Sequence, residues 1–137
     1  MRCEMDHIVL NTENEEQMIK FYSKVLQLPS ERLDEYRAGK VPFPSVRLNE
    51  HTIIDFFPKR MWGPSSVKGT GRKDLNHFCV SLEQAEWKRL VDRVTENGTT
   101  IDVGPVPRWG ACGVGTSVYF SDPEGNTIEA RYYEAER

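Results

Sequence analysis

The sequence contains only three cysteines, no hydrophobic run long enough to cross a membrane, and no apolar leader at its start. An odd number of cysteines at spacings unlike a zinc site fits a reducing cytoplasm better than a disulfide framework. A membrane-spanning helix needs roughly 18 or more apolar residues, and a signal peptide needs a shorter apolar run near the N-terminus. We therefore expect a cytoplasmic protein that does not interact with membranes.

The chain also lacks a strong charge of either sign. Its 18 basic and 21 acidic side chains are interspersed and give a formal net charge of −3, without a basic stripe. Nucleic acid is therefore not an expected partner. With 137 residues the chain can bury a core without disulfides, either as one domain or as two small modules that share a sheet.

Histidine is scarce too, but two of the three histidines occupy equivalent places in an internal repeat. His7 and His77 each stand second in an alternating, strand-like segment, and they are 70 positions apart (77 − 7). Asp55 and Glu129 each lie in the middle of a later strand-like segment, 74 positions apart (129 − 55). Two imidazoles and two carboxylates brought into register form a donor set for a catalytic divalent metal.

Helical patterns repeat at nearly the same interval. Segments 12–15 and 81–84 resemble capping boxes, which predict the start of a helix. Apolar residues follow at positions i, i+3, i+4 and i+7 in both halves: Met18, Phe21, Tyr22 and Val25, then Trp87, Leu90, Val91 and Val94. We expect the first helix to end near Pro29 and the second at Asn97-Gly98. An offset of 69 (87 − 18) supports a repeat of about 70 residues.

Each half has room for two further strands between its helix and its carboxylate strand. We expect these strands at 31–36 and 43–48 in the first half, and at 101–106 and 116–120 in the second. The glycine-rich segment 108–115 should connect the last two as a mobile lid. The prediction is an α+β fold of two β-α-β-β-β modules, residues 1–60 and 73–137, joined by a linker at 61–72.

Strand alternation sorts the side chains of these segments onto two faces. Ile8 and Leu10 should pack on the helix, whereas His7 and Val9 point the other way. By the same parity the second face carries the following residues: Ser45, Arg47, His77, Cys79, Ser117, Tyr119, Thr127, Glu129 and Arg131. We expect the two modules to form a curved mixed sheet whose polar face surrounds a central cavity.

Five motifs together resemble one known family, and the resemblance covers essentially the whole chain. They are Asp6–Leu10, Phe21–Leu26, Leu75–Phe78, Gly104–Arg108 and Ser117–Glu129. The sequence is similar to the vicinal oxygen chelate superfamily, which contains glyoxalases, bleomycin-resistance proteins and extradiol dioxygenases. Within it, the chain most resembles glyoxalase domain-containing proteins.

The resemblance implies a set of metal ligands. Members with enzymatic activity hold a metal on residues that match His7, His77 and Glu129 here. The fourth position is glutamate in true glyoxalase I, whereas this chain has Asp55, which is one methylene shorter. Asp55 is therefore expected to be either a fourth ligand or a general base, and the alternative is a solvated carboxylate beside the site.

Four further residues are candidates for substrate binding. Tyr119 and Ser117 resemble positions that line the cavity in some members, although cross-strand packing explains them equally well. Arg47 and Arg131 could bind an anionic substrate through paired hydrogen bonds, or pair with acidic residues at the rim.

The predicted function is that of a metal-dependent lyase or isomerase of the glyoxalase type, with a small oxygenated substrate chelated to Ni, Zn or Co. An extradiol-type dioxygenase with Fe(II) is the first alternative, and Mn-dependent thiol addition to an epoxide has less support. The alternative from another class is a binding protein that sequesters an antibiotic or metabolite. The resemblance also implies a homodimer.

Overall fold

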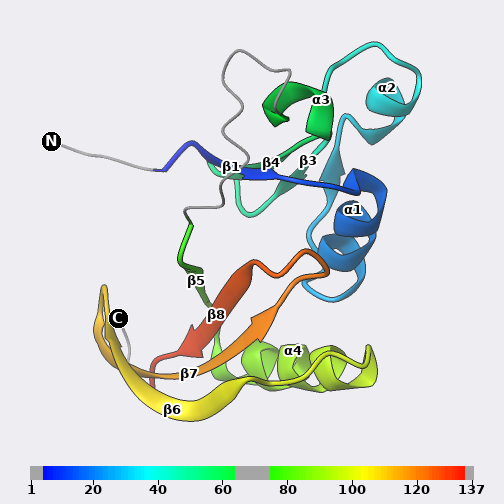
Figure 1. Cartoon of the computed structure of the whole chain (residues 1–137). Helices are drawn as coiled ribbons and strands as arrows, with labels where there is room; N and C mark the ends of the chain where they lie inside the picture. Colours follow the sequence, from blue (N-terminus) through cyan, green and yellow to red (C-terminus); the bar gives the residue numbers. More distant parts are fainter. Residues whose placement is uncertain (1–4, 64–74, 135–137) are drawn as a thin grey trace, which may run out of the picture. The chain divides into compact units, whose positions relative to one another are not determined.

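A computed structural model describes residues 5–63 and 75–134. The chain divides into two compact units, Met1–Asp74 and Leu75–Arg137 (Figure 1). Most of the predicted linker at 61–72 lies outside the described residues, and its first two residues belong to helix α3. None of the helices in the described ranges is long and apolar enough to span a membrane.

Unit 1 contains a four-stranded mixed sheet in the order β1-β4-β3-β2. The first strand pairs with the last in parallel, and the other pairs are antiparallel. In chain order the elements are β1 (His7–Asn11), α1 (Glu15–Lys24), β2 (Ser30–Glu31), α2 (Leu33–Arg37), β3 (Ser45–Arg47), β4 (Ile53–Phe57) and α3 (Lys59–Trp62).

Unit 2 repeats this topology with the order β5-β8-β7-β6, again with the first and last strands parallel. Its elements are β5 (Phe78–Ser81), α4 (Gln84–Glu96), β6 (Val103–Gly110), β7 (Gly113–Ser121) and β8 (Thr127–Tyr132). Figure 1 shows α4 running along the sheet of this unit. The α+β class and the repeated β-α-β-β-β order are therefore confirmed.

Each unit buries the apolar face of its sheet under its long helix. The buried helical residues include Met18, Phe21 and Tyr22 in α1, and Trp87, Leu90 and Val94 in α4. The buried strand residues that share this core are Leu10, Val46, Ile54 and Phe56 in unit 1, and Val118, Phe120, Ile128 and Ala130 in unit 2. The parity predicted for these strands is confirmed, and the opposite face is left for the polar candidates.

The start of α1 differs from the predicted capping box. Asn14 is the N-cap, and its side-chain oxygen accepts a hydrogen bond from the Gln17 backbone N–H at 3.0 Å. Thr12 is fully buried instead, where its hydroxyl donates to the Phe57 carbonyl at 3.0 Å. Thr12 therefore joins the end of β1 to the end of β4 and does not cap the helix.

The strand predicted at 31–36 is wrong. Only Ser30–Glu31 is extended, and Leu33–Arg37 forms the short helix α2. The chain turns at Arg32, whose φ of 59° is left-handed and ends the strand. The helix places Asp34 and Glu35 in its first turn and Arg37 in its last, which suits the helix dipole.

The glycine-rich segment 108–115 is not a loop. Strands β6 and β7 continue through it as a hairpin, so that only Ala111 and Cys112 form the turn. Trp109 pairs with Val114 in the ladder, and their exposed fractions are 80% and 65%. The predicted lid is therefore a strand-paired hairpin end with an exposed tryptophan.

Gly104 offers a test of how tightly β6 lies against β7. Its φ is +105°, and a Cβ there would overlap the Ser117 carbonyl oxygen and lie 3.1 Å from Val118 Cα. Gly104→Ala should therefore lower the free energy of unfolding by about 2 kcal/mol or more, because a backbone clash adds to the strain of the left-handed region. Gly39→Ala is the control, since its φ is +76° but its Cβ would meet open space. Urea denaturation should show the larger loss at Gly104, and equal losses would contradict the close approach.

Candidate metal centre

Unit 1 contributes a histidine and a buried carboxylate from adjacent strands. His7 begins β1, and Asp55 lies opposite Val9 on β4, two residues further along the parallel ladder. Asp55 is 6% exposed and accepts a hydrogen bond from the Ser45 hydroxyl at 2.6 Å. Ser45 is directly opposite Asp55 in the β3–β4 ladder, so the sheet register itself sets this contact.

The imidazole of His7 is half exposed and is oriented by the residue before it. The Asp6 carboxylate lies 2.7 Å from His7 Nδ1. This hydrogen bond raises the pKa of His7, and the negative charge of Asp55 acts in the same direction. A carboxylate can only accept, so the proton is on Nδ1 and Nε2 is the nitrogen left for a ligand.

Unit 2 contributes the second histidine and the most fully hydrogen-bonded carboxylate among the predicted residues. Glu129 is 3% exposed on β8. Its Oε1 lies 3.1 Å from His77 Nε2. Its Oε2 accepts hydrogen bonds from the Ser117 hydroxyl and from Arg131 Nη2, both at 2.7 Å. One oxygen is thus held by the protein, and the other faces the imidazole.

These contacts keep Glu129 ionised. Burial by itself would raise the pKa of Glu129, but the hydrogen bonds from Ser117 and Arg131 and the Arg131 charge outweigh it. The net result is a pKa below the ordinary value for glutamate. A carboxylate that stays charged at neutral pH is the form that a divalent metal binds.

His77 is oriented in the same way as His7. The Asn76 side-chain oxygen lies 2.6 Å from His77 Nδ1, which again leaves Nε2 for a ligand. The His77 ring also meets the Tyr119 ring edge to face, with centroids 5.8 Å apart. Sequence reasoning missed Asp6 and Asn76 as orienting residues. The available signal was an oxygen-bearing side chain directly before each repeated histidine.

Two of the predicted substrate-binding residues already have partners within their units. Arg47 forms an ion pair with Glu31 and donates to the backbone carbonyls of Asn49 and Glu50 at 3.2 and 3.1 Å. Ser117 is fully buried, and its hydroxyl donates a hydrogen bond to Glu129. Contact with substrate by Arg47 and Ser117 stays a prediction.

Tyr119 lies on the same strand as Ser117, opposite Glu129 in the β7–β8 ladder. The Arg108 guanidinium lies 5.8 Å from the centre of its ring. Burial raises the pKa of Tyr119, and the negative charge of Glu129 adds to the effect. A side-chain hydrogen bond to Glu129 acts in the same direction, so the phenol of Tyr119 donates to that carboxylate.

The His77–Glu129 pair suits a divalent transition metal in donor type and spacing. Imidazole nitrogen and carboxylate oxygen each bind zinc-like ions at about 2.0–2.2 Å, so two ligand atoms on one ion lie about 3 Å apart. The separation of 3.1 Å between Nε2 and Oε1 agrees with this value. Within residues 5–63 and 75–134, no three His, Cys, Asp or Glu side chains gather closely enough to hold an ion. Each unit by itself supplies one histidine and one carboxylate.

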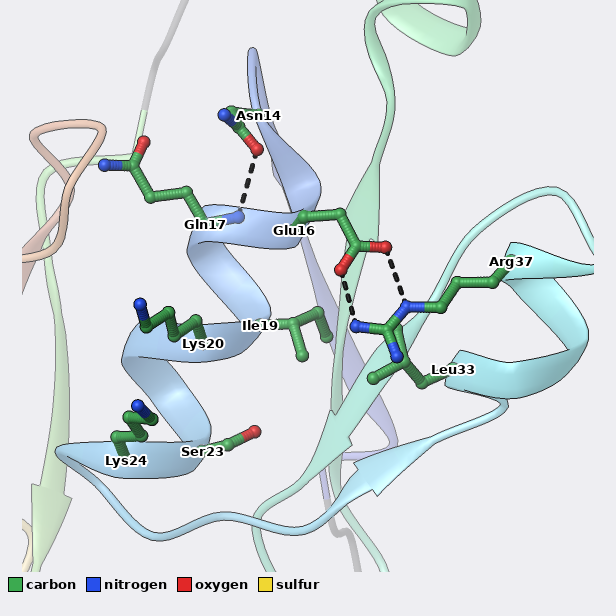
Figure 2. A pocket seen from close by; sticks show the side chains of 9 residues that line it. All are labelled: Asn14, Glu16, Gln17, Ile19, Lys20, Ser23, Lys24, Leu33 and Arg37. Atoms are coloured by element: carbon green, nitrogen blue, oxygen red, sulfur yellow. Dashed lines mark hydrogen bonds and ion pairs between the residues drawn. The ribbon is translucent and has the colours of Figure 1, made fainter.

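A separate cavity of about 680 Å³ lies beside α1 and α2 in unit 1 and contains none of the predicted site residues (Figure 2). Ile19 and Leu33 provide its apolar lining. Arg37 donates paired hydrogen bonds to Glu16 at 3.0 and 2.7 Å, drawn as dashed lines in Figure 2, and they hold the pKa of Glu16 below its ordinary value. This ion pair ties α2 to α1 and supports the helical layer of the unit.

Comparison with known proteins places this topology in a family. The chain is 31% identical over 130 residues to virulence protein STM3117 of Salmonella typhimurium, covering 94% of this chain and 83% of that protein. An integron cassette protein from the mobile metagenome of V. cholerae is 26% identical, with a TM-score of 0.77 and 98% of both chains covered. A glyoxalase/dioxygenase from Nostoc punctiforme is 27% identical, with a TM-score of 0.73, covering 96% of this chain and 92% of that one.

A family model agrees with these relatives. The model for the Glyoxalase/Bleomycin resistance protein/Dioxygenase superfamily matches residues 4–130. The match spans both units, from the strand with the first histidine to the strand with Glu129. The chain therefore belongs to the Glyoxalase/Bleomycin resistance protein/Dioxygenase superfamily.

Proposed function

We propose that this protein is a metal-dependent enzyme of the glyoxalase type, a lyase or isomerase that acts on a small oxygenated substrate. The observation that carries the proposal is the pair formed by His77 and Glu129. A nitrogen and a carboxylate oxygen face each other at 3.1 Å, and the second carboxylate oxygen is already held by Ser117 and Arg131. The same two atoms lie within hydrogen-bond distance of each other, and both are donor types that transition metals bind.

In the proposed site, His77 and Glu129 bind the metal together with His7, the corresponding histidine of unit 1. Asp6 and Asn76 hold the Nδ1 atoms of the two imidazoles and so present both Nε2 atoms for ligation. Bound there, a divalent ion supplies Lewis acidity to a substrate oxygen. Asp55 is the proposed fourth ligand or general base, because strand parity puts its buried carboxylate on the same face of the unit 1 sheet as His7.

Tyr119 is the proposed substrate-orienting group of unit 2. Its ring contacts His77, and its hydroxyl is hydrogen-bonded to Glu129, so Tyr119 lies directly beside the proposed ligands of unit 2. A donor beside a metal ligand is suited to hold a substrate oxygen through the reaction.

An iron-dependent dioxygenase is the second candidate, for two reasons. The proposed ligands, two histidines and one carboxylate, are the ligand set of non-haem Fe(II) oxygenases. The Nostoc punctiforme relative is named a glyoxalase/dioxygenase. The two candidates differ in the metal they use and in whether they need O₂.

Elemental analysis of the protein purified without a histidine tag tests the proposal. We expect about one equivalent of a transition metal per chain. Nickel, zinc or cobalt would direct assays to proton transfer next to a carbonyl, whereas iron would direct them to catechols with O₂. Absence of metal, with no thermal shift on adding Ni²⁺, Zn²⁺, Mn²⁺ or anaerobic Fe²⁺, would overturn the proposal in favour of a sequestering protein.

A further inference from the structure

Arg131 is the most heavily engaged polar side chain near the proposed ligands. Its side chain is 5% exposed, and it stands two residues after Glu129 on β8. The nearest acceptor is Glu129 Oε2, at 2.7 Å from Nη2. Burial alone would lower the pKa of Arg131, but the Glu129 carboxylate and its other partners raise it above its ordinary value. The guanidinium is therefore a permanent cation inside the unit.

Its other four hydrogen bonds go to three different places. Nε donates to the Cys79 sulfur at 3.3 Å, and Nη1 donates to the Tyr133 hydroxyl at 3.3 Å. The remaining two reach the closed end of the β6–β7 hairpin: Nη1 to the Arg108 carbonyl at 3.3 Å and Nη2 to the Trp109 carbonyl at 3.1 Å.

An arginine side chain has five N–H donors in a fixed planar fork. The five acceptors of Arg131 use one donor on Nε and two on each terminal nitrogen. No donor is left for an anionic substrate, so the arrangement argues against the substrate-binding role predicted from the sequence. The same count explains why the residue is arginine, since lysine has three donors on a single atom.

The hairpin end has a second connection to this group. The Cys112 backbone N–H, at the turn, donates to the Tyr133 hydroxyl at 3.2 Å, and that hydroxyl also accepts from Arg131. Arg131 therefore holds both the backbone of Trp109 and, through Tyr133, the turn itself. Figure 1 shows the strong curvature of β6, the yellow strand of this hairpin. The exposed Trp109 side chain is carried by a backbone that is tied to the proposed metal ligand.

We infer that Arg131 is a positioning residue that couples the closed end of the β6–β7 hairpin to the orientation of Glu129. The inference rests on the proposed function in one respect, namely that Glu129 is a metal ligand. Arg131 and Ser117 fix Oε2, and this leaves Oε1 directed at the His77 nitrogen. A displacement of the hairpin end shifts the position of the guanidinium, and through it the orientation of the Glu129 carboxylate. The position of the hairpin is thus linked to metal affinity, because residues that hold a metal ligand in place tune the affinity of the site.

The test compares Arg131→Lys and Arg131→Met with the wild type and with Arg89→Met. Arg89 is a matched control, because it also pairs with a glutamate in unit 2, at 2.9 Å, but is 59% exposed. Titration with Co²⁺ should show a 10- to 100-fold weaker affinity for both Arg131 variants, in the range roughly expected for loss of an outer-shell partner. The lysine variant keeps the positive charge, so a defect in it points to geometry rather than charge.

Hydrogen exchange of the metal-free proteins provides a readout that does not depend on metal. Faster exchange is expected at the hairpin end, residues 108–113, in Arg131→Lys and also in Glu129→Gln, with the amides of α4 unchanged. A purely structural role for Arg131 would not transmit a change at Glu129 to the hairpin. Unchanged hairpin exchange in Glu129→Gln would overturn the coupling, as would wild-type Co²⁺ affinity in both Arg131 variants. A wild type that binds no Co²⁺ would overturn the proposed function, and the exchange comparison would still decide the coupling.

Discussion

Replacing His77 with alanine is expected to abolish stoichiometric metal binding. The imidazole supplies one of the two donor atoms that unit 2 directs at the same point, and the other, Glu129 Oε1, lies 3.1 Å from His77 Nε2. Loss of a direct ligand should cost more than the roughly 10–100-fold that loss of an outer-shell partner costs. Elemental analysis together with Co²⁺ titration measures the effect. A variant that retains one equivalent of metal would contradict the assignment.

His51→Ala is the matched control for this experiment. His51 is the third histidine of the chain, and its side chain is 61% exposed beside Glu50. Its removal should leave metal content and affinity unchanged. The side chain of His77 is 37% exposed but pairs with the buried Glu129, so its loss should cost about 1–3 kcal/mol, and circular dichroism of the variant establishes that it is folded. Loss of metal in a folded His77 variant therefore reports ligation rather than unfolding.

The repeat and the parity of the strands could be read from the sequence because both are periodic. Alternation in β1 and β8 puts His7 and Glu129 on the face opposite Leu10 and Ile128. Burial confirms this in β1, where Leu10 is buried and His7 is exposed, and the ladder confirms it in β8, where Glu129 pairs with Cys79 and Tyr119. The helix over residues 84–96 was predictable for the same reason, since its apolar residues follow a period of 3.6.

The role of Arg131 could not be read from the sequence in the same way. Arg131 stands two residues after Glu129 on β8 and therefore lies on the same face of the strand, which made a role in substrate binding a reasonable expectation. Its actual partners lie 52 residues away at Cys79 and 22 residues away at Trp109, and they depend on how far the β6–β7 hairpin extends. Because glycines suggested a loop at 108–115, the hairpin carbonyls that Arg131 needs were not anticipated. Short-range patterns predict faces, but long-range hydrogen bonds decide which residues are left for a ligand.

Replacing Trp87 with alanine should have the largest effect on stability, because this residue joins α4 to the strand that carries Glu129. Trp87 is 6% exposed, its indole N–H donates to the Ala130 carbonyl at 2.8 Å, and its ring meets Tyr132 edge to face at 4.8 Å. Truncation of a buried tryptophan costs about 3–5 kcal/mol, since a cavity is left and a buried carbonyl loses its donor. Urea denaturation followed by circular dichroism measures this loss.

Two variants separate the causes of that loss. Trp87→Phe keeps an aromatic ring against Tyr132 but removes the hydrogen bond to Ala130, so it should cost less than the alanine variant. Trp109→Ala makes the same truncation as Trp87→Ala at a side chain that is 80% exposed, and should change stability by no more than about 0.5 kcal/mol. Equal losses for Trp87→Ala and Trp109→Ala would show that α4 does not anchor β8. Glu129 lies on β8 directly before Ala130. If α4 anchors this strand, the variants should lose the His77–Glu129 pair in urea in the same order as they lose stability: Trp87→Ala at the lowest concentration, then Trp87→Phe, then Trp109→Ala.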